Sequence, residues 1–125
     1  MVDIGKQITY WRTGAQDDWE SAQILIEKGK IRLGLFVVHL AIEKAMKALV
    51  CRHTNELAPK EHNLLALADM ANLSLSKDYR ETLGVINTFN IEGRYPGSRS
   101  PLPHQAEVSG IRRRTEEIYQ WLLNQ

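Results

Sequence analysis

The sequence has almost no cysteine, and this scarcity limits the redox chemistry open to the chain. Cys51 is the only cysteine among 125 residues, so no intrachain disulfide can form. Stable disulfides are typical of oxidising compartments, and their absence favours a reducing one. The first residues also lack the apolar stretch of a secretory signal peptide. We therefore expect a cytoplasmic protein.

Long apolar runs and an excess of one charge are missing as well. The longest apolar run, residues 34–42, is interrupted by His39, and a membrane span needs about 20 such residues. The formal net charge is only +1, so no overall field draws the chain to a membrane or to nucleic acid. We expect no membrane association, and any contact with nucleic acid must rest on a local patch.

The residues that are present predict one helical domain over residues 1–125. Apolar residues make up 43% of the chain and charged residues 25%, as in globular proteins. Apolar side chains recur every three or four positions from Ile4 to Ile26, which predicts a long helix that ends before Gly29. The same pattern predicts further helices at about 31–54, 61–72, 76–91 and 104–124, with a proline- and glycine-rich loop over 92–103.

These elements predict an all-α fold, an up-and-down antiparallel bundle of four main helices plus one short helix. The second helix is apolar on more than one face, so it should pack against several neighbours or against a second copy of the chain. The residues expected in the core are Trp11, Leu35, Val38, Ile42, Ile86, Ile111 and Ile118.

A line of polar residues interrupts the apolar surface of the second predicted helix. His39, Glu43 and Lys47 are four residues apart and share one helical edge, with Lys44 beside them. The edge is either a functional polar site or a solvent-exposed face with an ordinary Glu43–Lys47 ion pair. No further pair of ligands has suitable spacing, so we predict no metal site and no cofactor.

Two arginine-containing segments near the last helix are also candidates. Arg94 and Tyr95 lie in the proline- and glycine-rich stretch, where they can clamp a phosphate and stack on a base or simply pin the loop to the bundle. Arg99 is followed five positions later by His104. Some metal-independent ribonucleases use such a pair, the arginine to hold the phosphate and the histidine to move protons.

The ordered set of motifs resembles the HEPN domain family of small helical bundles. The residues that carry the resemblance span nearly the whole chain, and they are Trp11–Ala22 (WRTGAQDDWESA), His39–Leu49 (HLAIEKAMKAL), His62–Leu64 followed by Leu67, and Arg94–Pro96.

This resemblance implies a homodimer that associates with nucleotides or RNA, and a minimal nucleotidyltransferase as partner in a toxin–antitoxin-like pair. The ligand-binding residues would be His39, Glu43, Lys44, Lys47, Arg94 and Tyr95. Some members are metal-independent ribonucleases, and in this chain Arg99 and His104 would be the catalytic pair. Pro101 and Pro103 disfavour the regular helical start that such a motif needs. We therefore expect a non-catalytic module, with the ribonuclease as the alternative.

Overall fold

The fold is all-α, as the sequence predicts. The computed structural model describes the backbone of residues 2–94 and 101–125, and the side chains of residues 2–90 and 101–125. These residues form no strand, and their five helices are α1 (Ile4–Glu27), α2 (Ile31–Thr54), α3 (Leu64–Met70), α4 (Lys77–Arg94) and α5 (Gln105–Leu123).

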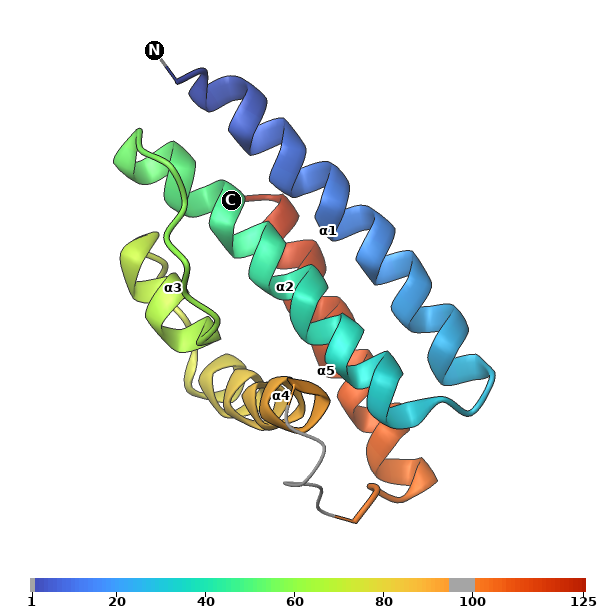
Figure 1. The fold of residues 1–125 in the computed structure, drawn as a ribbon. Helices are drawn as coiled ribbons and strands as arrows, with labels where there is room; N and C mark the ends of the chain where they lie inside the picture. The colour runs from blue at the N-terminus through green and yellow to red at the C-terminus, as the bar shows by residue number, and fades with distance from the viewer. Residues whose placement is uncertain (1, 95–100) are drawn as a thin grey trace.

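Helices α1 and α2 form a tight antiparallel pair, drawn in blue and in cyan to green in Figure 1. Asp3 begins α1 by accepting a hydrogen bond from the Lys6 amide, and Gly29 follows its end with a φ of +81°. The pair packs so closely at Gly34 that an added Cβ would lie 2.6 Å from Cγ1 of Ile26.

Helix α2 lies at the centre of the molecule and contacts each of the other four helices. Figure 1 shows α5 running behind α2, while α4 is strongly foreshortened and so is inclined to the long pair. Most of α2 is buried, including both Gly34 at its start and Cys51 near its end. The prediction that α2 packs against several neighbours is confirmed, and one copy of the chain already covers most of its apolar surface.

Two helix boundaries differ from the predicted ones. Helix α3 begins only at Leu64, because the Asn63 side chain accepts hydrogen bonds from the Leu65 and Ala66 amides and so caps the first turn. Helix α4 continues through residues 92–94, which the sequence assigned to a loop. Pro96 is the first proline after it, and a proline restricts only the residue directly before it.

The core is close to the predicted one. Six of the seven expected residues are buried, and Trp11 is only partly buried. The Trp19 ring stacks on Tyr119 with centroids 4.6 Å apart, which joins α1 to α5. Within residues 2–94 and 101–125, no helix is both long and apolar enough to cross a membrane.

Candidate functional site

The polar line of α2 is buried inside the bundle. His39 is 0% exposed, Glu43 is 4% exposed and Lys47 is 5% exposed. Their spacing of four residues places them on one edge of α2, and other parts of the chain cover that edge. The alternative of a solvent-exposed face is therefore wrong. Charged groups are seldom buried unless they are paired, so the contacts between these three residues determine whether the arrangement is stable.

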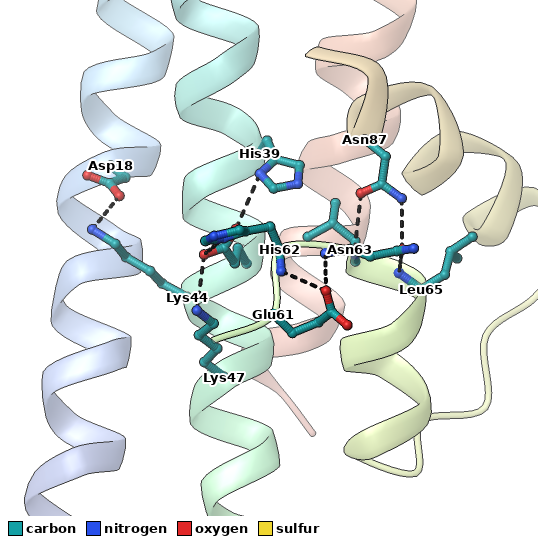
Figure 2. A network of polar contacts seen from close by, with 11 residues as sticks. Asp18, His39, Lys44, Lys47, Glu61, His62, Asn63, Leu65 and Asn87 are labelled. Carbon is teal, nitrogen blue, oxygen red and sulfur yellow. Dashed lines mark hydrogen bonds and ion pairs between the residues drawn. The ribbon is translucent and has the colours of Figure 1, made fainter. Parts of the chain in front are cut away.

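Glu43 is the centre of a group of four residues, which we call the Glu43 cluster: the buried His39, Glu43 and Lys47, and the half-exposed His62. Its carboxylate lies 3.2 Å from Lys47 Nζ, which confirms the expected ion pair. His39 Nδ1 lies 3.6 Å from Oε1 of the same carboxylate. The fourth member comes from outside α2, since His62 Nδ1 lies 3.2 Å from Oε1 and 3.3 Å from Oε2. Figure 2 shows the contacts that His39, His62 and Lys47 make with this one carboxylate.

The loop that carries His62 is fixed by its own hydrogen bonds. Glu61 accepts from the His62 and Asn63 amides at 3.0 and 3.3 Å. Asn87 of α4 accepts from the Leu64 amide at 3.1 Å and donates to the Asn63 side chain at 3.1 Å. Figure 2 shows this chain of contacts running from α4 through the loop towards α2. The Glu43 cluster is thus connected to the start of α3 and to α4.

On the other side of α2, Lys44 contacts α1. Its Nζ lies 2.7 Å from Oδ2 of Asp18, and the two side chains remain 30% and 22% exposed. Next to this ion pair is a hollow of about 340 Å³, lined by Tyr10, Thr13, Gly14, Asp17 and Lys44. Tyr10 is 66% exposed. An exposed aromatic ring and a partly exposed lysine side chain therefore border the same hollow.

Trp11 connects this hollow to the buried cluster. The Lys47 ammonium lies 5.1 Å from the centre of the Trp11 ring, a cation–π distance, while Tyr10 meets the same ring edge to face at 5.1 Å. Contacts therefore link Lys47 through Trp11 and Tyr10 to the hollow that Lys44 also lines. Among residues 2–94 and 101–125, no group of histidine, cysteine or carboxylate side chains is arranged to hold a metal ion.

The predicted site residues divide into three sets. His39, Glu43 and Lys47 lie together, and Lys44 lies beside them on the α1 side. Arg94 ends α4, but its side chain lies outside the described residues, as do Tyr95 and Arg99 entirely. That Arg94 and Tyr95 bind the same ligand as the α2 residues, as the family resemblance implies, therefore stays a prediction.

His104 occupies the position before the first residue of α5, with an extended backbone (φ −65°, ψ 158°) and an exposed side chain. The predicted range of about 104–124 makes His104 the first residue of the last helix, one position earlier than the observed start at Gln105. Pro103 directly precedes it, and residues 101–104 are not helical. The histidine of the candidate catalytic pair is therefore part of the connection into α5.

Asp18, Tyr10 and Asn87 also belong to this region, although none of them was singled out from the sequence as a site residue. Asp18 is part of the matched Trp11–Ala22 motif, but its contact with Lys44 depends on how α1 packs on α2. Tyr10 is exposed on α1 and carries no signal of its own. Asn87 lies among apolar residues of α4, and only the fold brings it to Asn63. His62 was present in a matched motif, but its contact with Glu43 depends on the path of the loop.

Comparisons with known proteins identify the family and the fold of the chain. The family model described as HEPN domain matches residues 8–125. The structure is similar to the crystal structure of TT1696 from Thermus thermophilus, with a TM-score of 0.76 and 20% identity over 94% of this chain and 97% of that chain. At this identity the likeness concerns the fold alone. No curated protein matches the chain.

Proposed function

Because this chain belongs to the HEPN domain family, we propose that it is a non-catalytic module that binds a nucleotide or RNA. The observation that carries the proposal is the hollow that Lys44 and Tyr10 share. A lysine ammonium binds phosphate as a point charge, and an aromatic ring stacks on a nucleobase. The hollow offers both groups at its border.

The roles of the two α2 lysines differ in this proposal. Lys44 reaches solvent and contacts the ligand, and a phosphate would compete with Asp18 for its ammonium group. Lys47 is buried and forms an ion pair with Glu43. It acts by holding Trp11 and the α1 side of the hollow in place. Arg94 and Tyr95, which lie next to each other in the sequence, would complete the binding residues as a second cation and a second aromatic ring.

The cluster residues His39 and Glu43 are positioning residues in this proposal. Both are buried, and Glu43 carries a negative charge that would repel a phosphate at close range. Their contribution is to fix α2 against the loop around His62, so that Lys44 and Tyr10 keep a constant spacing. A rigid border lowers the entropy lost when a ligand binds.

Binding can be tested by fluorescence polarisation with a labelled single-stranded RNA and with a labelled ATP analogue. We expect Lys44→Gln to weaken binding by about two- to fivefold, as loss of one exposed charge contact implies. Tyr10→Ala should weaken it by about five- to a hundredfold through lost stacking. Lys28→Gln serves as the matched control, because Lys28 is exposed beyond the end of α1 and away from the hollow.

Equal weakening by Lys28→Gln would mean that only diffuse charge attracts the ligand, and it would contradict the proposal. Unchanged binding after both Lys44→Gln and Tyr10→Ala would also contradict it.

Raising the salt concentration should weaken RNA binding with a shallow slope, since few cations border the hollow.

We also propose that the module acts as a homodimer with a minimal nucleotidyltransferase as partner. A two-fold dimer is the commonest assembly of small soluble proteins, and Leu33 on the first turn of α2 is 52% exposed. Light scattering at tens of micromolar should give twice the mass of one chain. Co-purification from the native host should recover the nucleotidyltransferase, and recovery of a monomer without it would contradict this assembly.

A further inference from the structure

A further hollow of the described residues is separate from the Glu43 cluster. It is a groove of about 740 Å³ between the first half of α4 and the second half of α5, and no member of the cluster lines it. This volume falls within the roughly 300–1,000 Å³ typical of binding sites. We call it the α4–α5 groove.

Part of the groove lining is apolar. The rings of Tyr79 and Trp121 meet edge to face with centroids 5.6 Å apart. Val85, further along α4, lines the same groove and is 44% exposed. Exposed apolar side chains next to partly buried aromatic rings provide a place where an apolar side chain of a partner can be removed from water.

The polar lining is predominantly acidic. Asp78, Glu81 and Glu117 contribute three negative charges, and Arg114 contributes the one positive charge among the lining residues. The groove is therefore net negative although the chain as a whole has a formal charge of +1. Burial raises the pKa of the Tyr79 hydroxyl above its ordinary value, and the charge of Glu117 raises it further.

We infer that the α4–α5 groove docks a basic amphipathic segment of a partner protein. An apolar side chain of that segment would lie against Tyr79, Trp121 and Val85, while its lysines or arginines would face Glu81 and Glu117. This inference deepens the partner role proposed above and rests on it for the class of occupant. It requires no binding of nucleotide at Lys44.

The chemistry of the groove favours this occupant over the other candidates. RNA carries the same sign of charge as the groove, so its phosphates would be repelled. A free polyamine would satisfy the carboxylates but has no apolar branch to cover Val85 and the two rings. A segment that alternates cations with apolar residues matches both parts of the lining, and complementary charge also gives specificity.

The probe for the test is a short fluorescein-labelled peptide of lysine and leucine at helical spacing, measured by fluorescence polarisation. The double variant Glu81→Gln/Glu117→Gln should weaken its binding by about three- to tenfold, as loss of two exposed charge contacts implies. The matched control is Glu116→Gln, because Glu116 is the exposed neighbour of Glu117 on α5 and does not line the groove.

The apolar part is tested with Val85→Ser, which should also weaken binding. Its control is Ile24→Ser, since Ile24 is a 58% exposed apolar residue on α1 outside the groove. Both positions are exposed, so the folded state should tolerate the changes. Amide chemical shifts should change at Thr82 and Val85 when the peptide is added, and they should change little at Ile24.

Three results would overturn the inference. The first is equal binding of a peptide in which serine replaces every leucine, because charge alone would then explain the affinity. The second is equal weakening by the groove variants and their controls. The third is stronger competition by spermine than by unlabelled peptide. RNA binding separates this inference from the proposed function, since Glu81→Gln/Glu117→Gln should leave RNA binding unchanged and Lys44→Gln should leave peptide binding unchanged.

Discussion

Nδ1 of His62 lies 3.2 Å from Oε1 of Glu43, although the two residues are 19 positions apart in the sequence. His62 belongs to the loop before α3 and is half exposed, whereas Glu43 is buried in the middle of α2. Hydrogen bonds to an ionised carboxylate are among the stronger ones in proteins. This contact therefore fastens the α2–α3 loop to the centre of the bundle.

Removing the Glu43 carboxylate should destabilise the fold strongly. In Glu43→Leu the Lys47 ammonium group loses its partner while its side chain stays 7% exposed. Breaking a buried ion pair on one side costs about 3–5 kcal/mol of unfolding free energy. Urea denaturation followed by circular dichroism measures this loss.

The partly exposed pair of Lys44 and Asp18 supplies the control for that measurement. Asp18→Asn removes an ion pair whose side chains are 30% and 22% exposed. Such pairs contribute about 0–1 kcal/mol, so this variant should remain close to the parent. A loss in Glu43→Leu no larger than that in Asp18→Asn would show that the buried pair does not stabilise the fold.

The sequence predicts the Glu43–Lys47 contact better than it predicts the burial of the residues around it. The spacing of Glu43 and Lys47 is enough to predict their ion pair, because residues four apart on a helix are neighbours. Spacing carries no information about what covers a helical edge, so the burial of His39 could not be predicted in the same way. Burial there depends on where α3 and its loop pack, which is a property of the whole fold.

The helices were predicted from apolar periodicity and the signals at their ends. Gly29 marks the end of α1 and α2 covers the predicted range 31–54. The end of α4 was harder to predict, since glycine and charged residues at 92–94 suit a loop and a last helical turn equally well. Tertiary contacts decide whether such residues are helical, and these contacts cannot be derived from one sequence by local patterns.

Two glycines on different helices should respond to alanine in opposite ways. In Gly34→Ala the new methyl would lie 2.6 Å from Cγ1 and 3.2 Å from the backbone nitrogen of Ile26, so α1 and α2 must move apart. Overpacking of this kind costs about 1–3 kcal/mol. Gly84→Ala meets nothing within 4 Å inside α4, and it should gain up to about 1 kcal/mol from helix propensity. Thermal denaturation of both variants tests the pair, and equal effects would contradict the close packing at Gly34.

The stability of the fold should fall at alkaline pH through Tyr119. Burial raises the pKa of its hydroxyl above the ordinary value of 10.0, with a further upward contribution from Glu20 and an opposing one from Arg12. The unfolded chain then loses this proton first, so the unfolding free energy decreases as pH rises past about 10. This contribution is fully present below that pH.

The variant Tyr119→Phe removes the titrating group and keeps the ring that stacks on Trp19. Its unfolding free energy should decrease less than that of the parent between about pH 8 and about pH 10.5. Tyr10→Phe is the control, because Tyr10 is 66% exposed and should follow the parent. An alkaline decrease of the same size in all three proteins would remove Tyr119 as its cause.

The last prediction concerns catalysis, and we expect the purified protein to show no ribonuclease activity in EDTA. Metal-free cleavage requires an arginine on the phosphate and a histidine within hydrogen-bond reach of the same reacting group. His104 is exposed and precedes α5 with an extended backbone, and residues 101–103 before it are not helical. Arg99 lies outside the described residues, and Pro101 and Pro103 disfavour in the sequence the helical turn that would bring the two side chains together. Incubation of single-stranded RNA with the parent, Arg99→Ala and His104→Ala is the test. Cleavage by the parent that both variants lose while remaining folded would establish the ribonuclease instead.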